Sequence, residues 1–156
     1  LFDSLSVRDN VLFPLIGNGR YCDQVLNNKL LDVLKLVGLE NYEEKMPYQL
    51  SGGQKKRVGL ARAIITEPKY ILYDEPTTGL DPIMSKTVED IIIRLNNIMN
   101  ITSIVVSHQK STILRTADKI YMIHKNGLLS PETPNTIETS DNNIITDFMK
   151  GTEYNE

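Results

Sequence analysis

Two short apolar runs separated by a helical pattern restrict most strongly what this chain can fold into. Residues 69–74 (KYILYD) and 101–106 (ITSIVV) are apolar or β-branched and are bounded by turn-forming residues, which is typical of buried strands. Residues 83–99 between them repeat apolar side chains at helical spacing. A helix that connects two buried strands predicts an α/β fold with a mostly parallel sheet covered on both faces.

The same periodicities predict the remaining elements. Further helices are expected within 1–20 and at 21–37, 51–66, 109–117 and 143–150. A third strand is expected at 119–124, followed by a hairpin turn at Lys125-Asn126-Gly127 and a polar loop at 130–142.

Composition narrows the class of protein. The 156 residues are 40% hydrophobic and 24% charged, which suits one globular domain or a piece of one. A net charge of −3 gives no basic field for nucleic acid, and Cys22, the only cysteine, cannot form an intrachain disulfide. No apolar run reaches membrane-spanning length, and we expect no signal peptide.

The pentapeptide Leu50-Ser51-Gly52-Gly53-Gln54 opens a predicted helix. A helix N-terminus presents free N–H groups and the positive end of the helix dipole. The two glycines permit close approach of a ligand, and Ser51 adds a hydroxyl. The motif predicts a phosphate site, although an ordinary Ser/Gly helix cap is an equal alternative from these residues alone.

Asp74 and Glu75 end the first strand. In parallel sheets, ligands bind at the carboxyl ends of the strands. Neighbouring strand residues point to opposite faces, so we expect different tasks for the two carboxylates: Asp74 holds Mg²⁺, and Glu75 accepts a proton from an attacking water. The alternative is a solvated acidic turn.

His108 follows the second strand at the same predicted edge, where it can donate to a phosphate oxygen. A lone histidine at such a position is more often a solvated surface residue. We assign no role to His124, and we interpret the basic residues along the helix at 51–66 as a solvated face rather than a nucleic-acid site; they are Lys55, Lys56, Arg57 and Arg62.

The ordered motifs LSGGQ (50–54), ILYDEPTTGLDP (71–82) and SH (107–108) resemble those of the ABC transporter ATPases. The resemblance extends over residues 1–128. It implies an ABC-type P-loop NTPase fold, with a mostly parallel sheet flanked by helices plus a helical subdomain. The expected division is a helical subdomain at 1–50, the ATPase core at 51–128 and a C-terminal extension at 129–156.

The resemblance also implies ATP and Mg²⁺ as cofactors and a role for each motif residue. Asp74 would serve Mg²⁺, Glu75 would polarise the water, and His108 would contact the γ-phosphate. Asp81 would link the two sites of a dimer. The residues expected to touch the ATP held by an opposing subunit are Ser51, Gly52, Gly53 and Gln54.

A narrower resemblance connects the chain to the ATPase subunits of MCE-linked (Mla-type) lipid transporters. It rests on LFDSLSVRDNV at 1–11, on Phe13-Pro14-Leu15, and on Phe148 with Gly151. It implies transport of phospholipid or another apolar compound, at the cytoplasmic face of a bacterial inner membrane. The implied partners are a second ATPase subunit, permease subunits and an MCE-type substrate-binding protein, with no nucleic acid.

The chain departs from the family in two respects. The P-loop pattern G-x-x-x-x-G-K-[ST] occurs nowhere in it, and it begins at Leu1 rather than Met. We therefore expect the N-terminal strands and the P-loop to be missing, and the chain alone to be inactive. An inactive fragment or split-gene product and a soluble non-transport ABC ATPase remain alternatives. The second departure is Gln109, which stands where the family usually has an acidic residue.

Overall fold

The structure is a computed structural model that describes residues 1–16, 22–125 and 127–151. Its elements in chain order are α1 (Val7–Leu12), η1 (Phe13–Leu15), α2 (Asp23–Leu36), η2 (Pro47–Gln49), α3 (Gly52–Ile64), β1 (Tyr70–Asp74), α4 (Pro82–Met99), β2 (Thr102–Val106), α5 (Lys110–Thr116), β3 (Ile123–His124), β4 (Gly127–Leu128), η3 (Ile137–Thr139) and α6 (Asn143–Lys150). No helix in these described ranges is long and apolar enough to cross a membrane.

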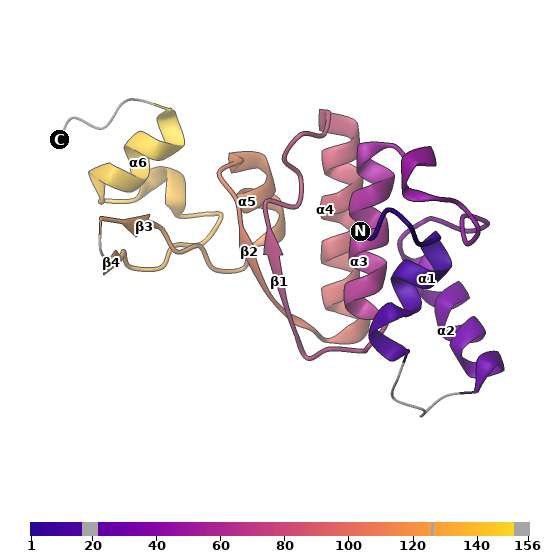
Figure 1. Cartoon of the computed structure of the whole chain (residues 1–156). Helices are drawn as coiled ribbons and strands as arrows, with labels where there is room; N and C mark the ends of the chain where they lie inside the picture. Colours follow the sequence, from indigo (N-terminus) through magenta and orange to yellow (C-terminus); the bar gives the residue numbers. More distant parts are fainter. Residues whose placement is uncertain (17–21, 126, 152–156) are drawn as a thin grey trace.

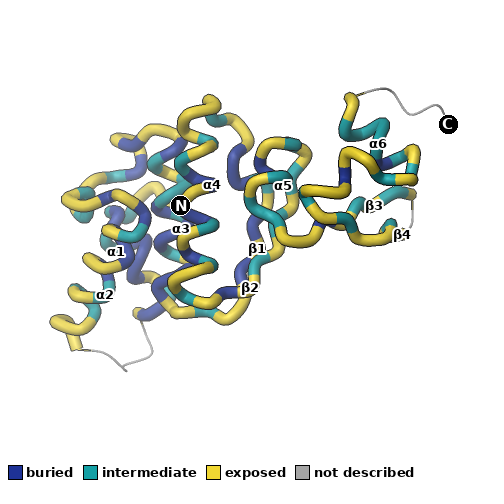
Figure 2. Tube along the Cα trace, turned by 180° about the vertical axis from the view of Figure 1, so that it is seen from behind, coloured by how far each residue is buried: buried dark blue, intermediate teal, exposed yellow. Residues whose placement is uncertain are grey.

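The helices α1 and α2 lie at one end of the molecule, the segment around α6 lies at the other, and α3, α4 and the β1–β2 sheet lie between them (Figure 1). One hydrophobic core joins α1–α4 to β1. Its fully buried members include Val11, Leu34, Ile64, Ile92 and Leu95. The burial of these apolar side chains is what holds the helices on the sheet (Figure 2).

The strands β1 and β2 pair in parallel, with Asp74 opposite Val106 at their carboxyl ends. This confirms the predicted parallel pair and its helical connection. Only one face of the pair is covered, because Ile71 and Tyr73 are buried whereas Leu72 and Ile104 are 76% and 58% exposed. The expectation of helices on both faces is therefore wrong for the part of the chain that the structure describes.

The C-terminal segment has a small core of its own. Ile120, Ile137 and Ile145 are buried together, and Ile113 and Leu114 of α5 pack against them. The predicted polar loop at 130–142 is wrong in part, because η3 buries Ile137 inside it.

The predicted third strand is also shorter than expected and does not extend the parallel sheet. Only Ile123 and His124 form β3, which pairs antiparallel with β4, whereas Ile120 makes an isolated bridge with Glu132. The hairpin is confirmed by this pairing. Asn126 of its predicted turn lies outside the described residues, as do residues 152–156 of the predicted C-terminal extension.

Candidate functional site: a glutamate–histidine pair at the edge of the sheet

Glu75 and His108 meet at the carboxyl ends of β1 and β2. Nδ1 of His108 lies 2.7 Å from Oε1 of Glu75, and the backbone N–H of His108 donates to the same oxygen at 3.1 Å. The hydroxyl of Thr78 donates to Oε2 at 2.7 Å. The two residues predicted to carry the chemistry are thus in direct contact, held by groups from both loops.

The backbone conformation of Glu75 aims its carboxylate at His108. Its φ of 46° lies in the left-handed region, which side chains other than glycine, asparagine and aspartate seldom adopt. The residue is held there by its N–H, which donates to the Val106 carbonyl at 2.9 Å, and by Lys56, whose Nζ donates to the Glu75 carbonyl at 2.8 Å.

Asp74 and Glu75 were expected to differ in direction because neighbouring strand residues point to opposite faces. The conformation of Glu75 shows that this reason is wrong. The strand ends at Asp74, so the alternation of strand side chains does not apply to Glu75. A left-handed residue just beyond the strand, and not the pleat, turns the second carboxylate away from the first.

Hydrogen bonds make Glu75 a stronger acid than an ordinary glutamate. The Thr78 hydroxyl contributes most and the His108 side chain next, and both lower the pKa of the Glu75 carboxyl because they donate to its charged form. The side chain remains about one-third exposed. A carboxylate with these partners is charged at neutral pH and open to solvent, which suits contact with a water molecule.

The signature pentapeptide forms the N-terminus of α3 as predicted. Ser51 Oγ accepts from the Gln54 N–H at 3.3 Å, and Gln54 Oε1 accepts from the Ser51 N–H at 2.8 Å, so the two form a capping box. The Ser51 hydroxyl hydrogen is not used in this box and can donate to an anion. Gln54 also donates from Nε2 to the Tyr42 hydroxyl at 3.1 Å.

The two glycines of this motif lie in different surroundings. Gly52 is exposed, whereas Gly53 is buried against α4, where an added Cβ would lie 3.3 Å from Sδ of Met84. Close packing of α3 on α4 is therefore one reason for a glycine at position 53, whereas Gly52 is open to solvent. The expected contact of Gly53 with ATP stays a prediction.

Asp81 is the N-cap of α4. Its Oδ1 accepts from the N–H groups of Ile83 and Met84 at 2.9 and 3.0 Å. The side chain is exposed, so its second oxygen can accept another donor. In the contacts found among the described residues, neither Asp81 nor Ser51 bonds to Glu75 or His108.

Asp74 lies exposed at the end of β1. The described residues contain no group of three or more metal-ligating side chains around it. A single carboxylate still fits Mg²⁺, which is commonly bound by one or two carboxylates, water and the phosphates of a substrate.

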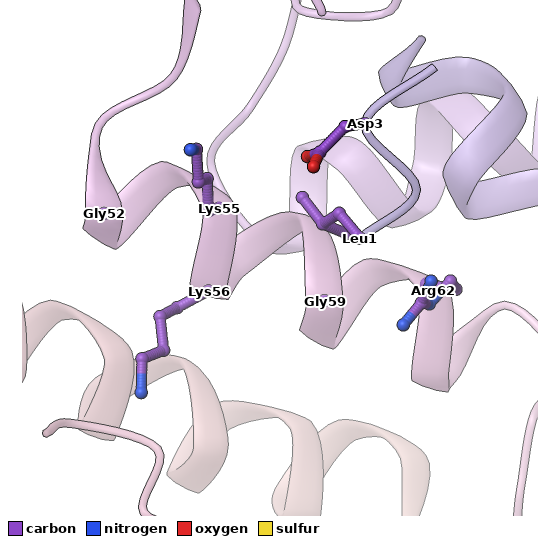
Figure 3. A pocket seen from close by; sticks show the side chains of 7 residues that line it. All are labelled: Leu1, Asp3, Gly52, Lys55, Lys56, Gly59 and Arg62. Carbon is purple, nitrogen blue, oxygen red and sulfur yellow. The ribbon is translucent and has the colours of Figure 1, made fainter. Parts of the chain in front are cut away.

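Three of the four basic residues of α3, namely Lys55, Lys56 and Arg62, border a shallow pocket of about 390 Å³ that also includes Gly52 (Figure 3). Figure 3 shows Lys55 and Lys56 leaving the helix on opposite sides. The interpretation of these residues as a solvated face is wrong for three of the four. Lys56 bonds to Glu75, Arg57 donates to the Val37 and Gly38 carbonyls, and Arg62 lies 5.4 Å from the Phe2 ring centroid.

Sequence reasoning missed Lys56 and Thr78 as partners of Glu75. Thr78 lies in the segment EPTTG, three residues after Glu75, and a turn over four residues brings its first and last members close together. No sequence signal marks Lys56, because its contact depends on how α3 packs beside the loop.

Comparison with known proteins places these features in one family. A sequence profile described as ABC transporter matches residues 1–78. Among curated relatives, the chain is 38% identical to the intermembrane phospholipid transport system ATP-binding protein MlaF of Haemophilus influenzae, over 97% of this chain and 57% of MlaF. It is also 38% identical to the chloroplastic protein TRIGALACTOSYLDIACYLGLYCEROL 3 of Arabidopsis thaliana, over 97% of this chain and 48% of that protein.

Solved structures agree with the sequence relatives. The cbiO1 subunit of the ABC transporter complex cbiONQ from Clostridium perfringens superposes with a TM-score of 0.79 and 26% identity, over 93% of this chain and 57% of cbiO1. The chain spans about half the length of the curated relatives it matches. It belongs to the ABC transporter family, and its curated relatives include Mla-like ATP-binding proteins.

Proposed function

We propose that this chain supplies the hydrolytic half of an ATP site in an ABC transporter that moves phospholipid or another apolar compound. The observation that carries the proposal is the Glu75–His108 pair, with 2.7 Å between Oε1 and Nδ1 at the carboxyl ends of two parallel strands. A charged, partly exposed carboxylate held by a histidine suits the orientation of a water next to a phosphate.

Each residue at the edge has a task in the proposed reaction. Glu75 orients the attacking water and takes its proton. His108 holds the Glu75 carboxylate before nucleotide binds, and its ring N–H is then available to donate to the γ-phosphate. Asp74 would hold Mg²⁺, which neutralises charge on the phosphates when bound. Lys56 and Thr78 fix the position of Glu75 in the absence of nucleotide.

The signature end of α3 serves a second copy of the subunit. Ser51 keeps a hydroxyl hydrogen free of the capping box, Gly52 is exposed, and the helix N-terminus is positive. These groups suit the triphosphate of an ATP bound mainly by the partner subunit. Gln54 holds Ser51 in place through the capping box. Asp81, exposed at the start of α4, would connect the two sites across such a dimer.

The transport role comes from the relatives. MlaF is named as part of an intermembrane phospholipid transport system, and this chain is 38% identical to it. We therefore propose that the chain works with permease subunits and an MCE-type substrate-binding protein, at the cytoplasmic face of a bacterial inner membrane.

The phosphate cradle for the chain's own ATP is proposed to come from residues outside 1–156, because the sequence holds no G-x-x-x-x-G-K-[ST] pattern. Purified residues 1–156 should then show no ATP turnover. Turnover by this chain alone that Glu75→Gln abolishes would refute this part of the proposal.

The test of the transport proposal uses the full-length subunit purified with its permease and reconstituted in vesicles. ATP should drive transfer of a labelled phospholipid, and Glu75→Gln should stop the transfer. Glu40→Gln is the matched control, since Glu40 is exposed and, among the contacts of the described residues, does not bond to Glu75 or His108. ATP-dependent transfer of a polar solute, with none of lipid, would contradict the proposed cargo.

A further inference from the structure

A buried chain of hydrogen bonds runs behind the Glu75–His108 pair. Thr77 Oγ1 lies 2.9 Å from Gln109 Oε1 and 2.9 Å from Thr112 Oγ1, and Thr112 Oγ1 lies 2.8 Å from Glu89 Oε1. Arg115 donates to the other oxygen of Glu89 and, at 2.7 Å, to Asp90. Thr77 and Thr112 are fully buried and Glu89 is 2% exposed.

This chain of hydrogen bonds joins the same two loops as the Glu75–His108 pair. Thr77 lies two residues after Glu75, and Gln109 directly follows His108. The Thr77–Gln109 bond is therefore a partly buried cross-link parallel to the exposed Glu75–His108 contact. Its far end is fixed by Glu89 of α4 and Arg115 of α5, so two helices determine how the two loops meet.

The number of available hydrogens decides in which direction the hydrogen bonds of this series are donated. Three contacts of 2.9 Å or shorter join Gln109, Thr77, Thr112 and Glu89, and each of them needs one hydrogen. A fourth contact, between Thr112 Oγ1 and Gln109 Oε1, is 3.5 Å long and is left out of this count. The two threonine hydroxyls supply two hydrogens, and a Glu89 carboxylate paired with a permanently charged arginine supplies none. The amide oxygen and NH₂ group of glutamine have the same outline, so the third hydrogen is available if the NH₂ group faces Thr77.

We propose that Gln109 is a positioning residue whose NH₂ group donates into this chain, which then runs from Gln109 through Thr77 and Thr112 to Glu89. The effect that we expect on ATP turnover rests on the proposed function, whereas the effect on unfolding temperature does not. A carboxylate at position 109 would bring no hydrogen. Only the hydroxyls of Thr77 and Thr112 would then lie between it and the Glu89 carboxylate. A donor at one end of the chain must therefore be matched by a carboxylate at the other.

Because a donor at one end must match a carboxylate at the other, the direction of hydrogen-bond donation should be reversible. In the single variant Gln109→Glu the chain lacks one hydrogen. Adding Glu89→Gln supplies an NH₂ group at the far end, so the bonds can run from position 89 through Thr112 and Thr77 to position 109. Arg115 keeps Asp90 as a partner in this double variant.

The experiment is a double-mutant cycle in the full-length subunit, with unfolding temperature, kcat and KM for ATP measured for each variant. Gln109→Glu should lower kcat about tenfold with little change in KM, because it leaves a group of the buried Thr77–Thr112 pair without its hydrogen bond. The double variant should regain most of the lost kcat and unfolding temperature. Gln24→Glu, exposed on α2, is the matched control for added charge and should change neither.

A second variant covers the case in which Gln109→Glu does not fold. Gln109→Met removes the donor without adding charge, and it should lower kcat and unfolding temperature less than Gln109→Glu does. The inference is wrong if Gln109→Glu matches the wild type, if the effects of the two substitutions simply add, or if Gln109→Met is as damaging as Gln109→Glu. The unfolding temperatures test the chain even in a protein that shows no ATP turnover.

Discussion

Lys56 donates from Nζ to the backbone carbonyl of Glu75 at 2.8 Å. The helix that begins at the signature motif is thereby tied to the residue proposed to activate water. Because this residue sits in a left-handed conformation, the lysine helps to hold a backbone that would otherwise relax.

Lys56→Met should lower kcat about three- to tenfold, since a hydrogen bond from a charged donor is worth about 1.5–3 kcal/mol and only part of that acts on the reaction. The measurement is ATP turnover by the full-length subunit. Lys55→Met is the control, because Lys55 lies on the same helix and is exposed. Equal activity of the two variants would mean that the Lys56 contact does not position Glu75.

Thr78→Val should raise the pKa of the Glu75 carboxyl, because it removes the donor that lowers this pKa most. The depressed pKa stabilises the folded protein above the pKa of an unfolded glutamate, and this stabilisation is lost as pH falls through the folded pKa. A carboxyl-carbon NMR titration of the two proteins measures the change. Thr66→Val is the control, and an unchanged pKa in Thr78→Val would show that His108 alone lowers it.

Asp81→Ala should lower the free energy of unfolding by about 1 kcal/mol, because α4 loses the side chain that caps its first turn. Asp81→Asn should keep most of this stability, since asparagine is an equally good N-cap. Denaturant unfolding measures both. If Asp81→Asn nevertheless loses ATP turnover, the charge of Asp81 acts beyond the cap, as the proposed link between two subunits requires.

Two glycines of α3 should respond differently to alanine. At Gly59 an added Cβ meets nothing within 4 Å, so Gly59→Ala should stabilise the protein by about 0.5–1 kcal/mol through the better helix propensity. Gly53→Ala should gain less or lose stability, because Met84 must move. Denaturant unfolding of the two variants makes the comparison, and an equal gain at both would contradict the tight α3–α4 contact.

Helices and strands with a clear hydrophobic period and turn residues at both ends could be predicted from the sequence. It predicted α3, α4, β1 and β2 to within two residues, together with the parallel pairing of the strands. It failed at 119–124, because apolar content alone does not show which residues find a strand partner.

The site was predictable only at the level of residue type. Motif order identified Glu75 and His108, but not the left-handed φ that brings them together, because that angle results from tertiary hydrogen bonds. The buried chain behind them had one weak signal, namely Glu89 between the apolar residues Val88 and Ile91 of α4. A charged residue on a buried helix face requires a partner, and the sequence does not name Arg115 as that partner.

The most direct test of the account is the rate of ATP hydrolysis by the full-length subunit with and without Glu75→Gln, with Glu40→Gln measured beside it. The account predicts that Glu75→Gln lowers kcat by about 10²-fold or more while ATP still binds, because general-base catalysis contributes about 10²–10⁴-fold. Glu40→Gln should keep the wild-type rate. Full turnover by Glu75→Gln would contradict the assignment of Glu75 and, with it, the proposed role of the Glu75–His108 pair.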